Sequence, residues 1–186
     1  ADVSLGLDAA ALSTAIAGDT NGDGFEELLY YDAGARAWMA LSGSGSGLSG
    51  SPHNTGSGSD GTPAQALSGD LDGNGRRDVV VPGKGNTWQW LRQGPGTAYH
   101  HSTTGVTNVA PAGNTALVDV DGDGRDDFVF VRDPGTSISW RRNLTAGETA
   151  SFATEAVLWT ATQGTRIAAQ PFVTAAPRFR STERTA

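Results

Sequence analysis

One nine-residue pattern of acidic residues, asparagine and glycine occurs three times in this 186-residue chain. The copies read DTNGDGFEE from Asp19, DLDGNGRRD from Asp70 and DVDGDGRDD from Asp119, so their first residues are 51 and 49 residues apart. A repeat of about 50 residues is typical of propellers and other arrays in which each repeat is one supersecondary unit. The chain is therefore expected to fold as a row of similar units.

Each pattern is flanked by short stretches that favour β-strands. β-branched and aromatic residues between turns of Gly, Pro and Asp are the usual signal. The stretches that precede the patterns are 14–17, 64–67 and 115–118, and those that follow are 28–31, 79–81 and 128–131. Third stretches containing Trp occupy 37–41, 88–91 and 138–140, and weaker fourth signals include 97–101 and 151–154.

Two segments allow another interpretation. Residues 10–17 have a composition that favours a helix, but they align with the strand before the other two patterns, so we expect a strand. Residues 42–61 are rich in Gly and Ser and resemble a linker. Because the repeat resumes on schedule, we expect a long outer loop with a poor fourth strand there, although a domain boundary is the alternative.

These signals predict an all-β, propeller-like array of about three four-stranded antiparallel blades. The blades are expected at about 10–60, 61–111 and 112–160, so that repeats fill 1–160 and 161–186 form a tail or the start of another segment. Closed propellers typically use about 4–8 blades. We therefore expect the chain to be a fragment, part of a larger propeller.

The three patterns concentrate negative charge. They contain 12 of the 20 Asp and Glu residues in only 27 positions. Like charges this close repel one another, by about 1 kcal/mol per pair at ~4 Å in water. Such clustering favours a bound cation, and three divalent ions would bring the formal net charge of −7 close to neutral.

Oxygen-bearing side chains occupy positions 1, 3, 5 and 9 of every pattern, and position 6 is always Gly, which permits a tight loop. Position 7 shares no side-chain chemistry, so its backbone carbonyl is the expected fifth ligand. Five or six oxygens suit Ca²⁺ better than Mg²⁺. The expected ligands are Asp19, Asn21, Asp23, Phe25 and Glu27; Asp70, Asp72, Asn74, Arg76 and Asp78; and Asp119, Asp121, Asp123, Arg125 and Asp127.

The loops and their spacing resemble the FG-GAP/VCBS repeats of integrin-like β-propellers. In that family a D-x-[DN]-x-[DN]-G-x-x-[DE] loop joins the first two strands of a blade and holds Ca²⁺. The resemblance covers about residues 10–160 and implies that the ions, about three, are structural. It implies further a non-catalytic module of a secreted or cell-surface protein that binds a glycan or protein ligand through loops at the propeller face.

Two alternatives follow from relatives of the same family. The chain could be the propeller part of a carbohydrate-active enzyme such as a polysaccharide lyase, or a scaffold segment of a large bacterial toxin-shell protein. Other classes are excluded by composition. The acidic charge argues against nucleic acid, no apolar run is long enough to insert into a membrane, and without Cys there is no thiol chemistry.

A few residues outside the loops are further candidates. Trp88 and Trp90 lie two residues apart and so share one face of the expected strand. Their recurrence in the repeat favours packing between blades, and stacking on a sugar ring is the alternative. Asn143 begins an Asn-Leu-Thr glycosylation sequon. The third loop, with four carboxylates against three in each of the others, is expected to hold its ion tightest.

Overall fold

The computed structural model describes residues 7–58, 66–83, 87–93, 98–107, 115–132 and 137–160. Within them, strands dominate and one short helix is present. The helix is α1 (Ala9–Thr14). The strands are β1 (Ile16–Gly18), β2 (Glu27–Asp32), β3 (Ala37–Ser42), β4 (Ser49–Gly58), β5 (Leu67–Gly69), β6 (Asp78–Pro82), β7 (Thr87–Gln93), β8 (Tyr99–Thr107), β9 (Thr115–Val118), β10 (Asp127–Arg132), β11 (Ser137–Arg141) and β12 (Ala156–Thr160).

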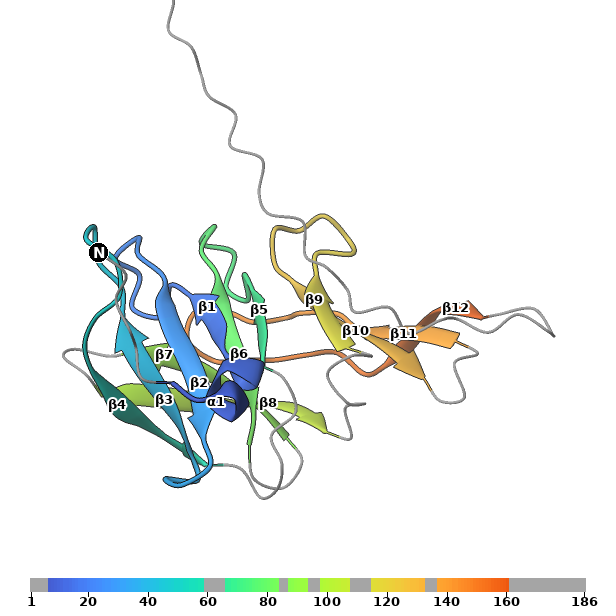
Figure 1. Cartoon of the computed structure of the whole chain (residues 1–186). Coiled ribbons are helices and arrows are strands. Elements are labelled where there is room, and N and C mark those ends of the chain that lie inside the picture. The colour runs from blue at the N-terminus through green and yellow to red at the C-terminus, as the bar shows by residue number, and fades with distance from the viewer. Residues whose placement is uncertain are drawn as a thin grey trace, which may run out of the picture.

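The strands form three antiparallel sheets of four, each a simple meander in chain order (Figure 1). We call the sheets β1–β4, β5–β8 and β9–β12 blades 1, 2 and 3. In every blade the first two strands meet at the acidic loop, because Gly18 pairs with Glu27, Gly69 with Asp78 and Val118 with Asp127. The predicted all-β array of three four-stranded blades is confirmed. The predicted tail, 161–186, lies outside the described residues.

The hydrophobic core lies between the blades. Blade 2 is buried on both faces, which explains why β6 is a continuous run of valines. Val79 and Val81 pack with Leu29 and Trp38 of blade 1. Val80 packs on the opposite side in the cluster that holds Leu117, Phe128 and Phe130 of blade 3. The order of the blades in the chain is therefore also their order in space.

The linker-like segment is part of a strand. β4 comprises Ser49–Gly58, and it pairs with β3 in spite of its Gly and Ser content. Thr55 is 2% exposed, and its hydroxyl donates to the carbonyl oxygen of Trp38 at 2.9 Å. Thr104 of β8 makes the same bond to Trp88, also at 2.9 Å. The expected fourth strand is therefore present, and its ten residues leave a shorter loop than expected.

The start of blade 1 also differs from the expected strand over residues 10–17. Residues Ala9–Thr14 form α1, which begins where the backbone N–H of Ala11 donates to the Asp8 carboxylate at 2.7 Å. Ala11 packs with Tyr30 and Leu41, on the face of blade 1 that turns away from blade 2. The strand proper is only Ile16–Gly18. The helix thus covers part of the apolar surface on this face of blade 1.

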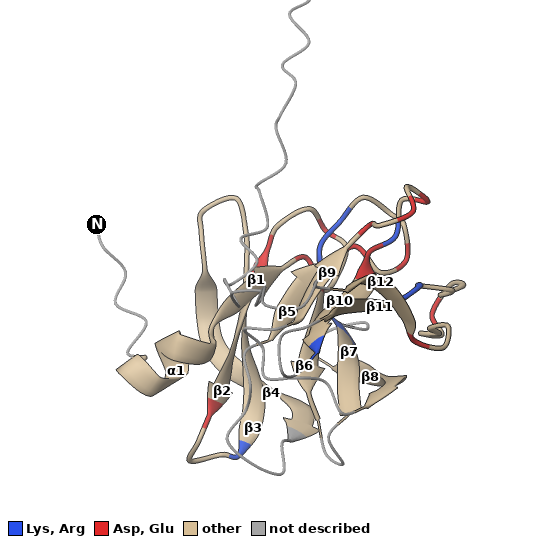
Figure 2. Ribbon diagram, turned by 90° about the vertical axis from the view of Figure 1, so that its right-hand side faces the viewer, with Lys and Arg blue, Asp and Glu red and all other residues tan. Residues whose placement is uncertain are grey.

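The described part of the chain contains no helix with the length and apolar character needed to cross a bilayer. Most of the described acidic residues lie at the end of the sheets that carries the β1–β2, β5–β6 and β9–β10 loops (Figure 2).

Candidate metal centres in the hairpin loops

The first Asp of each loop organises the loop backbone. Both of its carboxylate oxygens accept hydrogen bonds from backbone N–H groups three to five residues further on. Side-chain acceptors of this kind replace the backbone partners that a tight loop cannot supply. The backbone N–H groups at positions 4 and 6 both donate to this carboxylate. The N···O distances are 2.7 Å and 2.9 Å from Gly22 and Gly24 to Asp19, 2.8 Å and 2.7 Å from Gly73 and Gly75 to Asp70, and 2.8 Å and 3.0 Å from Gly122 and Gly124 to Asp119.

Two glycines in each loop adopt the left-handed conformation, whereas the sequence analysis identified only the one at position 6. Gly24, at position 6 of the first loop, has φ of 91°, and Gly22, at position 4, has φ of 75°. The second and third loops repeat both values within about 10°. The signal for position 4 was present in the sequence, since all three patterns have Gly there.

The second and third loops bring three carboxylates together. One oxygen each from Asp70, Asp72 and Asp78 lies within 4.8 Å of the others. The equivalent trio, Asp119, Asp121 and Asp127, does the same. Three carboxylate oxygens at this separation can all contact one cation, so the residue types and their placement fit a hard divalent ion such as Ca²⁺.

The last acid of each loop is buried. Glu27 and Asp127 are 0% exposed and Asp78 is 5% exposed. Burial raises the pKa of all three carboxyls, and that of Asp78 reaches about 7. A buried carboxylate without a compensating charge destabilises a fold. A cation held by the loop would supply that charge, which is a second reason that the site fits a metal.

The last acid of each loop accepts from the backbone N–H at position 2, from Thr20 to Glu27 at 2.8 Å, from Leu71 to Asp78 at 2.8 Å and from Val120 to Asp127 at 3.0 Å. The first loop adds a second bond, because the hydroxyl of Thr20 also donates to Oε2 of Glu27 at 2.7 Å. Oε1 accepts from the amide of Asn21 at 3.2 Å. The amide of Asn21 also donates to Asp23 at 3.1 Å. Three predicted side-chain ligands of the first loop, Asn21, Asp23 and Glu27, are thus linked through the Asn21 amide.

Positions 5 and 7 are joined by the same bond in every loop. The backbone N–H at position 7 donates to the side-chain oxygen at position 5, from Phe25 to Asp23 at 2.8 Å, from Arg76 to Asn74 at 2.8 Å and from Arg125 to Asp123 at 3.0 Å. Coordination through the position-7 carbonyls stays a prediction.

The side chains at position 7 differ in what they contact. Phe25 is 43% exposed. The guanidinium of Arg76 crosses to the first loop and lies 3.6 Å from Asp19. The guanidinium of Arg125 pairs with Asp123 of its own loop at 2.8 Å.

Adjacent blades are joined at the loops by hydrogen bonds that the sequence analysis did not identify. The backbone N–H of Asp70 donates to the carboxylate of Asp126 at 2.9 Å, and the N–H of Asp126 donates back to the carbonyl of Asp70 at 2.6 Å. Asn143 is fully buried, and its amide donates to the carbonyls of Leu71 at 2.9 Å and Asp126 at 2.8 Å. Asn143 therefore cannot carry a glycan in the folded chain, which overturns the sequon interpretation.

The tryptophan pair is not a ligand surface. Trp88 is 3% exposed and Trp90 is 0% exposed. Both belong to the cluster between blades 2 and 3. They do share one face of β7, as expected, but that face is covered by blade 3. Packing between blades is the correct alternative, and stacking of Trp88 or Trp90 on a sugar is excluded.

Comparison with known proteins identifies the repeat. A family model described as an FG-GAP-like repeat matches residues 19–81 and again residues 70–130. Each match begins at the first Asp of a loop and ends in the second strand of the following blade. Together the matches span more than half of the chain. No curated protein matches it.

Proposed function

The chain belongs to the FG-GAP-like repeat family, and from that membership we propose that it is a calcium-binding module without catalytic activity of its own. Repeats of this family form propeller blades, so the three sheets are a β-propeller-type module. The family is generally non-catalytic. We therefore expect the chain to act by binding, through its loops and surfaces.

The observation that carries the calcium proposal is the pair of carboxylate trios with a buried last member. Asp78 and Asp127 are enclosed by their blades, and each shares its trio with two acids from the same loop. We propose about three Ca²⁺, one in each hairpin loop, with a structural role. Each ion would bind the first hairpin of a blade and compensate the charge of the buried carboxylate.

The proposed setting is extracellular, and the proposed partner is a glycan or a protein. FG-GAP repeats typically occur in extracellular proteins. Extracellular Ca²⁺ modules bind their ions with dissociation constants of about 0.1–1 mM, so the loops would be filled in that compartment. The alternatives, part of a polysaccharide lyase or a scaffold segment, remain consistent with the same blades and would be distinguished by activity on uronic-acid polymers.

Thermal unfolding tests the calcium proposal. The melting temperature should fall in excess chelator and recover when Ca²⁺ is added, because an ion that binds only the folded chain stabilises it by mass action. Asp78→Asn should reduce the recovery. Asp32→Asn, in the β2–β3 turn away from the loops, is the control and should leave it intact. A melting curve that does not respond to either treatment would reject the proposal.

A further inference from the structure

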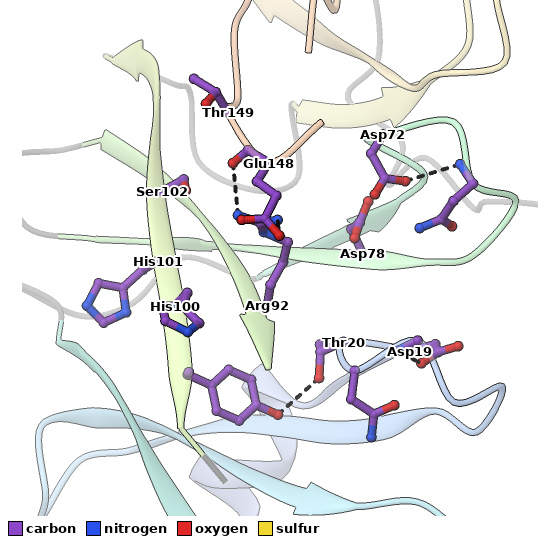
Figure 3. A pocket seen from close by; sticks show the side chains of 14 residues that line it. Asp19, Thr20, Asp72, Asp78, Arg92, His100, His101, Ser102, Glu148 and Thr149 are labelled. Atoms are coloured by element: carbon purple, nitrogen blue, oxygen red, sulfur yellow. Dashed lines mark hydrogen bonds and ion pairs between the residues drawn. The ribbon is translucent and has the colours of Figure 1, made fainter. Parts of the chain in front are cut away.

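A pocket of about 710 Å³ lies where the three blades meet, at the end that carries the acidic loops (Figure 3). The first and second loops form one side of it, the ends of β7 and β8 form another, and the turn at Glu148 and Thr149 of blade 3 closes it. Small-molecule sites in proteins have volumes of about 300–1,000 Å³. The pocket therefore has the size of a ligand site for a molecule of a few rings.

The loop side of the pocket accepts hydrogen bonds. Asp19 comes from the first loop, and Asp72 and Asp78 come from the second. Asp72 and Asp78 also belong to the second carboxylate trio, so an ion held by that trio would border the pocket. Ca²⁺ takes about 6–8 oxygen ligands, more than one loop supplies. Hydroxyl groups of a ligand are therefore suitable partners for this side.

Arg92 fixes the opposite side. Its guanidinium stacks 4.3 Å from the ring centroid of Trp90. One nitrogen donates to the carbonyl oxygen of Glu148 at 2.8 Å, and another lies 3.6 Å from the carboxylate of Glu148. The arginine is thus held in place by both blades and already has its counter-ion. It can donate to a ligand oxygen, but it offers no uncompensated positive charge to an anion.

The remaining side chains are small and polar. Ser102 and Thr149 contribute hydroxyls, and His100 and His101 are exposed at the β8 side of the pocket (Figure 3). The hydroxyl of Thr20 meets that of Tyr99 at 3.0 Å, which joins the first loop to β8. Donors and acceptors therefore alternate around the pocket without a large apolar surface. This arrangement suits a ligand with many hydroxyl groups.

We infer that this pocket binds a neutral oligosaccharide. A neutral sugar can donate hydroxyl hydrogens to Asp72 and Glu148 and accept from Arg92 and the small hydroxyls. An acidic sugar would find the guanidinium of Arg92 already compensated by the carboxylate of Glu148. The inference rests on the proposed function as a calcium-stabilised binding module, and it moves the sugar site from the buried tryptophans to this pocket.

Isothermal titration of the full chain, in about 1 mM Ca²⁺, tests the inference. The probes are cellotriose, maltotriose, mannotriose and triacetylchitotriose, with trigalacturonate as the anionic comparison. At least one neutral trisaccharide should bind, and trigalacturonate should bind more weakly or not at all. Tighter binding of trigalacturonate would overturn the assignment to neutral sugars.

Two matched substitutions locate the site. Ser102→Trp fills the pocket and should lower the affinity at least about tenfold. Thr103→Trp, at the next residue of β8, is exposed and lies outside the lining, so it should leave the affinity unchanged. Arg92→Gln should also weaken binding, since a neutral amide cannot replace the guanidinium. Equal losses in the two Trp variants would place the site elsewhere.

The melting temperature separates failure of this inference from failure of the proposed function. A wild-type chain that Ca²⁺ stabilises, but that binds none of the neutral trisaccharides, would overturn the pocket inference alone. A chain whose melting temperature does not respond to Ca²⁺ would overturn the proposed function. Variants are compared only after Ca²⁺ is shown to raise their melting temperatures as in the wild type.

Discussion

The second and third acidic loops have nearly the same sequence pattern but different neighbours. The second loop is packed between blades, where Asp70 exchanges two backbone-directed hydrogen bonds with Asp126 of blade 3. The third loop lies at the end of the described array. A Cβ atom at Gly73 of the second loop would lie 3.2 Å from the Arg125 side chain, whereas one at the equivalent Gly122 of the third loop would meet no other described atom within 4 Å. Among the described residues, the second loop therefore contacts both of its neighbouring loops, through Arg76 and Asp70, and the third loop contacts only the second.

The two loops also differ in their counter-ions. Arg142 pairs with Asp121, and it lies 3.4 Å from Asp123. Arg125 donates to Asp123, and this hydrogen bond lowers the pKa of the Asp123 carboxyl. Among the described residues, no ion pair involves Asp72 or Asp78. Two predicted ligands of the third loop are thus already paired with arginines, whereas those of the second loop are not.

From this difference we expect that the number of carboxylates alone does not set the Ca²⁺ affinity of a loop. The sequence favoured the third loop, because it has one acid more than the others. An ion that enters the third loop must compete with two guanidinium groups for Asp121 and Asp123. In the second loop it would instead compensate the buried charge of Asp78. We now expect the second loop to bind Ca²⁺ more tightly.

The largest expected effect concerns the interface between blades 2 and 3. A Cβ atom at Gly69 would lie 2.4 Å from the Asp126 carboxylate and 2.8 Å from Cβ of Leu117. Gly69→Ala should therefore lower the free energy of unfolding by about 3 kcal/mol through overpacking. The equivalent residue of blade 3 is Val118, which is 40% exposed. Val118→Ala should change the free energy of unfolding by less than about 0.5 kcal/mol. Urea unfolding measures both changes. Equal losses of stability in the two variants would mean that Gly69 is no more tightly packed than Val118.

A second pair of variants compares the acids at position 9 of the second and third loops. Asp78→Asn should remove about 2 kcal/mol of the stabilisation that Ca²⁺ provides, and Asp127→Asn should remove less. The reason is that the second loop has no arginine to displace. The measurement is the difference in melting temperature between Ca²⁺ and chelator for each variant. A larger loss for Asp127→Asn would restore the sequence-based ranking.

The pH dependence follows from the pKa of Asp78, which burial raises to about 7. Between the unfolded pKa of about 4 and this value the folded, metal-free chain binds more protons than the unfolded chain. Its stability should fall as the pH rises through that window, by up to about 1.4 kcal/mol per pH unit from this group. Ca²⁺ needs the ionised carboxylate, so its stabilising effect should grow over the same window.

Thermal melts with Ca²⁺ and with chelator, from about pH 5.5 to about pH 8, check this prediction. The difference in melting temperature between Ca²⁺ and chelator should increase as the pH rises. Asp78→Asn should remove most of this increase. A difference that is constant with pH in the wild type would show that Asp78 does not exchange a proton for the ion.

The smallest expected effect concerns Arg142, which pairs with the third loop. Arg142→Gln removes a partner of Asp121 and Asp123, and it should raise the Ca²⁺ affinity of the third loop about fivefold, or about 1 kcal/mol. Arg36→Gln removes the same charge from the β2–β3 turn and serves as the control. Isothermal titration calorimetry with Ca²⁺ measures the affinity of both variants. An affinity that is unchanged in Arg142→Gln would show that the arginine does not compete with the ion.

The repeats, the strands and the loop positions could be predicted because their signals are local. A hairpin loop with Asp first, Gly at positions 4 and 6 and an acid at position 9 closes through bonds within nine residues. The β-branched stretches beside it pair with the nearest strands along the chain. The differences fell on α1, where the alignment of the repeats favoured a strand, and on β4, which is longer than its composition indicated. Contacts within blade 1 decided both.

The roles of several residues depend on contacts between blades, and these contacts cannot be read from the sequence alone. Trp88 and Trp90 could have been exposed or buried until blade 3 was placed against β7. Asn143 has the sequence of a glycan acceptor, but its amide bonds to Leu71, 72 residues away in the chain. The sequence by itself determined three acidic hairpin loops on three blades. The tertiary structure decided which loop is packed, which is paired with arginines, and where a ligand can enter.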